Sequence, residues 1–482
     1  MNIRAVFHLI SFLLAFITIG VFASYGVSWL YNDAWAVQQG MRAASLLSLL
    51  ISGALWYYTR GPIDLSRRDG FGIVVFGWLA AMIVAMIPYL LTGAIPDPFA
   101  AMFESMSGLT ATGSTALVDI EALPAGILFW RSLTQWYGGM GIIVMAVAIL
   151  PFLGVGGMQL FNAEMSGPSK DRLTPRIAST AKLLWGLYVL LTLVALVALR
   201  WAGLNWFDAI NHALTSAATG GFSTYNASIA HFQSVAVELI IAGVALLSAI
   251  SFPLHYRALT GRPIVYFRDP QLRFFMSVWV LAILVVTWNL LAHSNSSLTH
   301  SLRAAVFQVT TFITSAGFVS ADYDQWPAFS RFVLLLLMIV GGCAGSTTGG
   351  MKMIRVFVLM KKAVREIRLF MRPNAVVQVK IGPHTLSQDV ISKVTSYFVI
   401  YMMIWMLGTL AMTLFTPDLE SAFSAVVTAL SNMGPAFGTV GATQNFSHIG
   451  SGGKVLMTFL MLLGRLELYT VLVLFLPSFW KR

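Results

Sequence analysis

The chain is poor in charged residues and almost without cysteine. Asp, Glu, Lys and Arg make up only 10% of its 482 residues, whereas about a quarter of an ordinary soluble domain is charged. The single cysteine, Cys343, excludes an internal disulfide framework. The composition therefore argues against both a typical soluble domain and a small secreted domain held by disulfides.

Apolar residues take the place of the missing charges. They account for 57% of the chain, and the mean hydropathy is +0.78. Long apolar runs separated by short basic loops indicate a helical membrane protein with several spans. The first run, VFHLISFLLAFITIGVFASYGVSWL, is longer than the apolar region of a signal peptide and has no clear small-residue cleavage site. We therefore expect it to be a retained membrane helix.

The net charge of +11 could indicate binding to nucleic acid. Most of the 30 Lys and Arg residues, however, fall in loops that the alternation of spans places on one side. The positive-inside rule makes that side cytoplasmic. The orientation of the chain in a lipid bilayer thus explains the excess of basic residues, and no nucleic-acid partner is expected.

Full-length spans alternate with a segment that is too short to cross a membrane. Two spans come first, near 6–30 and 43–58, and a third near 72–92 is followed by a half-apolar segment at 98–110 and a span at 130–153. About twelve helical residues measure ~18 Å, less than the ~30 Å hydrocarbon core. We expect the short segment to re-enter and leave on one side, buried in protein or lining a cavity.

The same unit recurs three more times. Spans near 180–200 and 235–254, 273–292 and 331–352, and 391–415 and 454–477 bracket the strings NWFDAINHALTSAATGG, SLRAAVFQVTTFITSAG and DLESAFSAVVTALSNMG, while the first copy reads DPFAAMFESMSGLTATG. Each string starts with a helix-capping residue type, has Ala four residues later and Gly sixteen residues later. These residues are Asp97, Asn205, Ser301 and Asp418; Ala101, Ala209, Ala305 and Ala422; and Gly113, Gly221, Gly317 and Gly434. Shared spacing in four segments indicates internal repetition.

The repeats predict the architecture. We expect an all-α integral membrane protein with two N-terminal spans and four repeats of span, pore loop and span around a pseudo-fourfold central pore, about ten transmembrane helices altogether. The expected divisions are 1–68 for the two-helix extension and 69–164, 165–268, 269–375 and 376–482 for the four pore repeats. Because basic loops flank each unit, the short helices are expected to enter from the outer face.

The polar residues after each short helix have the composition of a cation filter. A helix that begins at the outer surface ends near the middle of the membrane, where its dipole places about half a negative charge. The strings TATG, ATGG, TSAG and SNMG contain no carboxylate, which favours a monovalent cation held by backbone carbonyls over a divalent site. The plainer alternative is a helix-terminating glycine turn. Four copies in register favour the filter.

Several motifs carry a family resemblance. SGLTATGST, AATGGFST, TSAGF and NMGPAFG, with QWYGGMGIIVMAVAILP, GGCAGSTTGG and LLGRLE, resemble the bacterial Trk-type potassium-uptake membrane subunits, of the superfamily shared with the Ktr and HKT transporters. The resemblance extends over nearly the whole chain. It implies a homodimer of four-repeat pores in the bacterial inner membrane, each passing K+ inward without a bound cofactor, and a cytoplasmic nucleotide-binding regulatory ring (TrkA-like) as partner.

The resemblance also implies roles for individual residues. Gly at the first repeat's filter position goes with potassium in this superfamily, and Ser with sodium-preferring relatives, so Gly113 favours potassium. The carbonyl-donating role falls on Ala111, Thr112, Thr219, Gly220, Ser315, Ala316, Asn432 and Met433. The predicted filter also includes Thr110, Gly113, Gly221, Gly317 and Gly434.

The inner half of one span is rich in glycine. Between Arg331 and Lys352 lie twenty uncharged residues that end in GGCAGSTTGG, and each Gly costs ~1 kcal/mol relative to Ala in a helix. We expect an unwound gating loop at Gly341–Gly350, which is also its role in the family, with Gly341, Gly342, Gly345, Ser346, Thr347, Thr348, Gly349 and Gly350 as gate residues. A phosphate-binding loop is disfavoured because the Gly-Lys-Ser/Thr ending is missing. The other alternative is a glycine-rich helix packed closely on a neighbour.

Further polar residues lie at membrane depth. Arg465 falls near the middle of the last span, where a charge costs a few kcal/mol and marks a functional candidate. We expect it to act in the gate as a positive barrier, and the alternative is an ion pair with a buried acid such as Glu104. Seven residues after the first three caps come Glu104, His212 and Gln308, which are expected to support the filter backbone. The fourth copy has Ala425 there.

Potassium uptake through a channel-like filter is the function that these patterns favour. The alternative is a proton- or sodium-coupled symporter for K+ or Na+ with alternating access. Such transporters often contain inverted repeats, whereas all four units here are expected to enter from one side. A membrane enzyme is disfavoured because no cluster of His or acidic residues falls at membrane depth. The basic tract MKKAVREIRLFMRPN either lies on the membrane surface or docks the regulatory ring.

Overall fold

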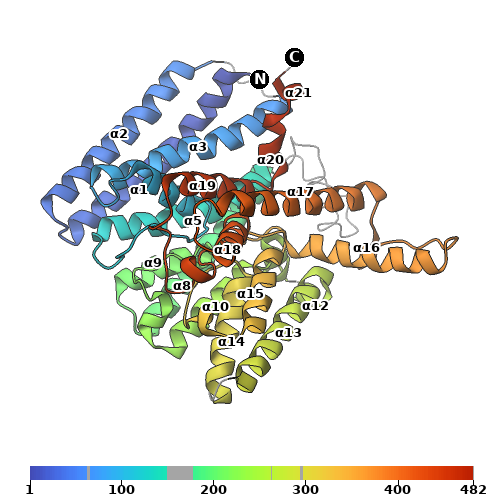
Figure 1. Ribbon diagram of the computed structural model, residues 1–482. Helices are drawn as coiled ribbons and strands as arrows, with labels where there is room; N and C mark the ends of the chain where they lie inside the picture. The colour runs from blue at the N-terminus through green and yellow to red at the C-terminus, as the bar shows by residue number, and fades with distance from the viewer. Residues whose placement is uncertain (62–65, 149–176, 262, 294–296, 481–482) are drawn as a thin grey trace.

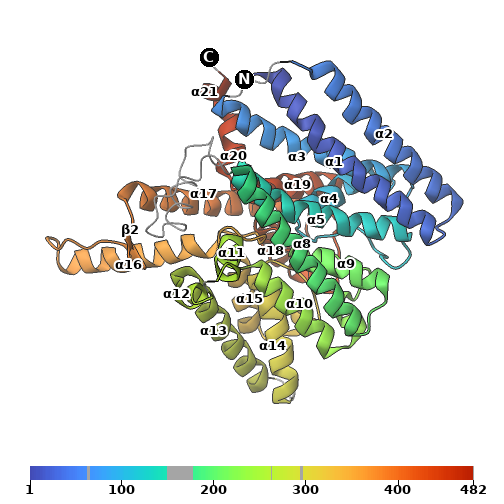
Figure 2. The same cartoon turned by 180° about the vertical axis from the view of Figure 1, so that it is seen from behind.

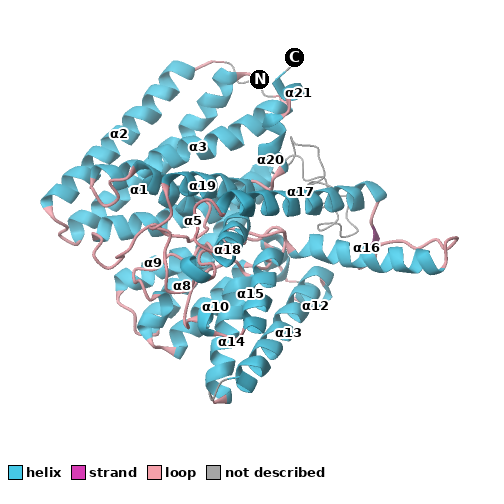
Figure 3. Ribbon diagram, viewed as in Figure 1, coloured by secondary structure: helices cyan, strands magenta, loops and turns pink. Residues whose placement is uncertain are grey.

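The computed structural model describes residues 1–61, 66–148, 177–261, 263–293 and 297–480. Helices form almost all of its regular structure (Figure 3). The strands in the described ranges form a single hairpin, in which β1 (Lys380–Ile381) runs antiparallel to β2 (His384–Thr385) with Lys380 opposite Thr385. The expected all-α fold is confirmed.

The N-terminal helices form a layer at one end of the molecule (Figure 1). α1 (Ile3–Leu30) packs on α2 (Trp35–Thr59), α3 (Arg67–Leu91) and α5 (Ala125–Ala148). These contacts join the two-helix extension to the first of the four units.

Four short helices each lie between two further helices. They are α4 (Pro98–Leu109), α9 (Trp206–Ala217), α14 (Leu298–Ile313) and α18 (Leu419–Ser431). The helices before them are α3, α8 (Ile177–Trp201), α13 (Pro270–His293) and α17 (Gln388–Met412), and those after them are α5, α10 (Val235–Ser248), α15 (Ala328–Val340) and α19 (Ser451–Arg465). All four units thus contain, in the expected order, a long first helix, a short helix and a second helix. The expected end of the span at 130–153 and the division at 164 and 165 lie outside the described residues.

Three of the four expected helix caps are confirmed. Asp97, Asn205 and Asp418 each accept a backbone N–H of the first turn. Ser301 was wrong as a cap, because the third short helix begins one turn earlier at Ser297, whose Oγ accepts the N–H of His300 at 3.3 Å. Serine can cap a helix at either position, so the residue type alone does not distinguish the two.

The second spans of units two and four are broken, contrary to the continuous spans expected at 235–254 and 454–477. α11 (Phe252–Leu259) is bent by 96° from α10, since Pro253 stands in its first turn and has no N–H to continue a helix. After α19, Tyr469–Phe475 is bent by 110°. Arg465 is therefore the last residue of α19 at a break, and not the middle of a continuous span.

Length and composition mark fewer spans than the ten expected. Among the described residues, five helices, α1, α3, α8, α13 and α17, are long and apolar enough to cross a membrane, or seven spans if each bent pair counts as one. Short and bent second helices account for part of the difference. The architecture is nevertheless that of an all-helical membrane protein.

The four units close into a ring. α5 packs on α9, α10 on α14, α15 on α18, and α19 on α4, so the last helix of each unit contacts the short helix of the next. Loop segments gather between the helix groups at the centre of the molecule (Figure 3). The segments that follow the short helices therefore meet at one place.

The remaining elements connect or extend the units. α16 (Met353–Met371) projects from the body beside α17 in both views (Figure 1, Figure 2). The others are η1 (Ser228–Phe232), α12 (Val265–Arg268), η2 (Tyr323–Gln325), η3 (Gly438–Val440), α20 (Tyr469–Leu472), η4 (Val473–Phe475) and α21 (Pro477–Trp480).

Candidate functional site

All four short helices end in the same backbone geometry. Fourteen residues after each predicted cap, one residue takes a left-handed conformation: Ala111, Thr219, Ser315 and Asn432 have φ of 50°, 52°, 50° and 49°. The next N–H then bonds a carbonyl five residues earlier, from Thr112 to Ser107 (2.8 Å), Gly220 to Thr215 (2.9 Å), Ala316 to Thr311 (2.8 Å) and Met433 to Thr428 (3.0 Å). This is a Schellman ending. It usually contains glycine, and a non-glycine residue there costs about 1–2 kcal/mol.

The repetition of this strain shows that the four endings are built alike. Backbone strain of this kind concentrates at functional sites, where the surrounding structure holds it in place. Three of the four following glycines also have positive φ, namely Gly113 at 90°, Gly221 at 83° and Gly317 at 70°. Gly434 precedes Pro435 and does not have positive φ, so an unusual backbone angle requires glycine in three repeats only.

Close approach of the backbone explains glycine in all four. A Cβ added to Gly113 would lie 2.1 Å from the Gly220 oxygen, and one added to Gly221 would lie 2.3 Å from the Ala316 oxygen. A Cβ on Gly317 would lie 2.8 Å from the Gly434 nitrogen. A Cβ on Gly434 would lie 3.1 Å from the carbonyl carbon of Gly113. Contacts thus run from each repeat to the next and return to the first, which closes a ring of backbone.

Polar side chains also connect the first repeat to the fourth, where the ring of backbone closes. Ser114 Oγ donates to the Gly434 carbonyl at 2.7 Å, and Asn432 Nδ2 donates to Thr112 Oγ1 at 3.1 Å. The described part of the chain contains no group of three or more His, Cys, Asp or Glu side chains that could hold a metal ion. The ring therefore offers neutral oxygen atoms, which suit a monovalent cation.

The three residues expected to support the filter bond the segment just beyond it. Each contacts backbone or hydroxyl groups two to four residues after its repeat's glycine, and Ser424, beside Ala425, takes this place in the fourth repeat. The pairs are Glu104 with Ala116 N (3.0 Å) and Thr115 Oγ1 (3.0 Å), His212 with Ser223 Oγ (3.0 Å), Gln308 with the Ala321 oxygen (3.3 Å), and Ser424 with Phe437 N (3.1 Å). None of these five bonds is to a predicted cation ligand.

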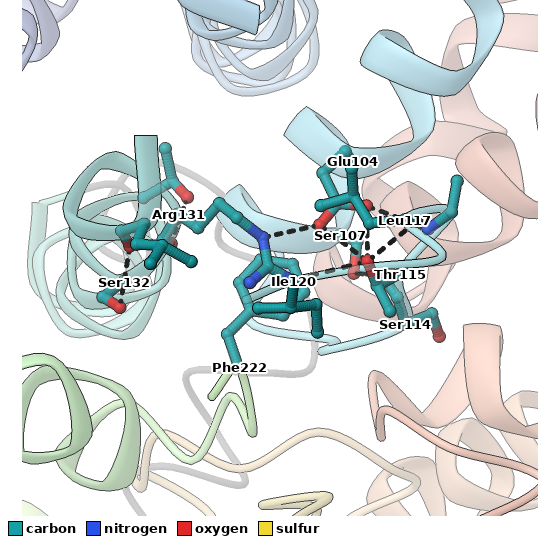
Figure 4. A network of polar contacts seen from close by, with 12 residues as sticks. Glu104, Ser107, Ser114, Thr115, Leu117, Ile120, Arg131, Ser132 and Phe222 are labelled. Atoms are coloured by element: carbon teal, nitrogen blue, oxygen red, sulfur yellow. Dashed lines mark hydrogen bonds and ion pairs between the residues drawn. The ribbon is translucent and has the colours of Figure 1, made fainter. Parts of the chain in front are cut away.

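The alternative of an ion pair between Arg465 and Glu104 is wrong. Glu104 pairs with Arg131 of α5, with 2.9 Å between Oε1 and Nε, and the two side chains are 0% and 1% exposed (Figure 4). Arg131 is a site residue that our sequence analysis missed. An arginine inside an otherwise apolar span was the signal that could have identified it.

The segment Gly341–Gly350 is non-helical and mostly buried, so the alternative of a glycine-rich helix is wrong. It lies against the ends of the short helices. Thr347 Oγ1 is 3.2 Å from Thr219 Oγ1, and Gly349 N–H donates to Ser315 Oγ at 2.7 Å. The loop thus touches two of the four strained residues directly.

Two buried cations lie beside this loop. Arg465, 4% exposed, donates from Nη1 to the Thr347 carbonyl at 3.0 Å and from Nη2 to the Gly138 carbonyl at 2.8 Å. Lys352, which was expected at the end of the span that begins after Arg331, is 6% exposed and donates from Nζ to the Thr348 carbonyl. Carbonyl oxygens balance both charges. Arg465 therefore ties the loop to α5.

The chain as a whole is similar to known cation transport proteins. The family model TrkH, described as cation transport protein, matches residues 37–482. The Trk system potassium uptake protein TrkH of Escherichia coli (strain K12) is 41% identical over 489 residues, covering 100% of both chains. TrkG of the same organism, also named a Trk system potassium uptake protein, is 34% identical and covers 100% of this chain and 99% of its own. A crystal structure of the potassium transporter TrkH from Vibrio parahaemolyticus has 38% identity and a TM-score of 0.91, with full coverage of both chains.

Proposed function

The chain belongs to the TrkH family of cation transport proteins, and we propose that it carries potassium into the bacterial cell through the closed ring of four backbone segments. Its relatives are named potassium uptake proteins. It is thus a transport protein and not an enzyme.

The observation that carries the proposal is the fourfold geometry of the ring. Four short helices direct their carboxyl ends to the segments that form it, and each helix end has partial negative charge. Backbone oxygens of neutral residues can then replace the hydration shell of a desolvated cation. The predicted ligands are the carbonyl oxygens around Ala111 and Thr112 and their counterparts in the other repeats.

Passage is controlled, in this proposal, by the loop Gly341–Gly350 together with Arg465. The loop packs on the inner ends of the short helices, and the arginine side chain bonds its Thr347 carbonyl at 3.0 Å. A buried positive charge on the path of a cation is a barrier until it moves. Because the sequence predicts that all four units enter from the same side, a continuous gated pore is favoured over alternating access.

The assembly follows from the resemblance to Trk-type subunits. We propose a homodimer in the bacterial inner membrane, with the basic loops cytoplasmic and a TrkA-like nucleotide-binding ring as regulatory partner. The positive-inside rule supports the orientation. The exposed basic and apolar residues of α16, among them Lys361, Arg368 and Phe370, are available for contact with the ring or with lipid.

The test is uptake of Rb+, a potassium analogue, into liposomes that contain the purified chain, with and without competing Na+. We expect Rb+ uptake that Na+ inhibits weakly. Gly113→Ser is expected to lose this preference, because its Cβ would lie 2.1 Å from the Gly220 oxygen. Gly261→Ser is the matched control, since Gly261 has a similar φ of 94° and no neighbour within 4 Å of the added Cβ. Unaltered rate and selectivity in Gly113→Ser would contradict the filter assignment.

A further inference from the structure

The filter segment of the second repeat, Gly220–Ser223, is bonded by side chains from the first repeat. α5 packs on α9, and its Arg131 and Gln135 are one helical turn apart, so they share a face. Both side chains are buried, at 1% and 0% exposure. Between them they bond three backbone groups within four residues of the filter segment.

Gln135 holds both sides of the filter glycine Gly221. Its Nε2 donates to the Gly220 carbonyl oxygen at 2.7 Å, and its Oε1 accepts the Phe222 N–H at 3.1 Å. The same Gly220 oxygen lies against Gly113, whose added Cβ would be 2.1 Å from it. Gln135 therefore determines where this predicted cation ligand lies relative to the first repeat's glycine.

Arg131 holds the other end of the segment. Its Nη1 donates to the Ser223 carbonyl at 3.2 Å, and its guanidinium carbon lies 4.1 Å from the centre of the Phe222 ring. Figure 4 shows the side chain extending from α5 toward Glu104, with Phe222 beside it. Glu104 balances the charge, so the guanidinium can remain buried as a rigid, planar donor.

The other three segments are bonded both within and between repeats. Their own short helices supply the bonds that join Ser107 Oγ to the Ser114 oxygen (2.6 Å), Gln308 Nε2 to the Ala321 oxygen (3.3 Å), and Thr428 Oγ1 to the Met433 oxygen (2.6 Å). Neighbouring repeats supply the bonds that join Ser114 Oγ to the Gly434 oxygen (2.7 Å) and Tyr323 Oη to the Ala436 oxygen (3.0 Å). In the second segment, a single side chain of the preceding repeat, Gln135, bonds the backbone on both sides of the filter glycine.

We propose that Gln135 is a positioning residue for cation selectivity, which it controls by holding the Gly220 carbonyl in place against Gly113. The inference rests on the proposed function of the ring as a filter. A smaller ion such as Na+ is coordinated well only if oxygen atoms move closer to it. An oxygen held by an amide donor resists that movement, so the larger K+ or Rb+ is favoured.

The test replaces Gln135 by methionine, which keeps the side chain's length and volume and removes both hydrogen bonds. In liposomes containing the full chain, we expect Gln135→Met to lower the ratio of Rb+ to Na+ uptake by about two- to tenfold, the factor associated with one neutral hydrogen bond. Faster Na+ uptake should account for most of the change. Gln271→Met is the matched control, because Gln271 is also buried and its Nε2 has no partner among the described residues. It should keep the wild-type ratio.

A second variant covers the case in which the methionine variant does not fold. Gln135→Glu keeps an acceptor for the Phe222 N–H and loses the amide donor to Gly220, so its uptake ratio should fall as well. A folded variant of either kind with the wild-type ratio would overturn the role of Gln135, even if its melting temperature were lower. Wild-type liposomes without Rb+ uptake would instead overturn the proposed function.

Discussion

Replacing Arg465 by glutamine should open the closed path. The Arg465 guanidinium donates to the Thr347 carbonyl of the loop at 3.0 Å and to the Gly138 carbonyl of α5 at 2.8 Å. Glutamine is shorter and neutral, so it cannot span both oxygens. A hydrogen bond from a charged group contributes about 1.5–3 kcal/mol. Loss of the bond to the loop therefore shifts its equilibrium toward release by about 10- to 150-fold, at 1.4 kcal/mol for each factor of ten.

The assay is basal Rb+ flux through liposomes that contain the chain without any regulatory partner. Arg465→Gln should raise the initial rate, and the control Arg200→Gln should not, although Arg200 also donates to a backbone carbonyl, that of Leu204 at 3.3 Å. Arg465→Lys distinguishes a gate held by hydrogen bonds from a barrier made by positive charge. Lysine keeps the charge and loses the two-pronged donor geometry of arginine. A high flux in both variants indicates that the hydrogen bonds hold the gate, and a high flux in the glutamine variant alone indicates a charge barrier. Wild-type flux in a well-folded Arg465→Gln would refute the reasoning.

Two further predictions concern the loop and the buried ion pair. Deletion of Ala344 and Gly345 should shorten the loop enough to raise basal Rb+ flux several-fold, and unchanged or lower flux in a folded protein would count against its role as a gate. Arg131→Met should lower stability by about 3–5 kcal/mol, because it leaves the Glu104 carboxylate buried without its partner. Adding Glu104→Gln to that variant should recover much of the loss, as measured by thermal unfolding in detergent, and no recovery would show that the Arg131 contacts with the second repeat dominate.

The sequence was sufficient to predict the repeats, because the patterns that identify them are local. Asp97, Asn205 and Asp418 cap helices through bonds to residues two or three positions away. The glycine spacing follows from the length of one short helix and its ending. The unwound loop at Gly341–Gly350 could be predicted for the same reason, since glycine weakens a helix wherever the helix lies.

Contacts between residues far apart in the sequence could not be read in this way. The ion pair of Glu104 with Arg131, the bonds of Gln135 to the second filter segment and the position of Arg465 beside Thr347 join residues 27, 85 and 118 positions apart. Ser301 and Ser297 are equally good caps by residue type, and only the structure identifies Ser297 as the cap. The bend between α10 and α11 has a local cause in Pro253, but it also brings a contact between repeats, since the Phe252 N–H bonds the Gly345 carbonyl of the third repeat at 3.0 Å.

The sequence alone was thus sufficient to predict four short helices, each followed by a neutral, glycine-containing segment, because helix capping and the length of an apolar run are local properties. Only the tertiary structure decided which side chains hold those segments together. The physical reason is that a buried polar group must find partners. Arg131, Gln135 and Arg465 each donate to the backbone of another repeat, which comes within reach only after the ring has closed.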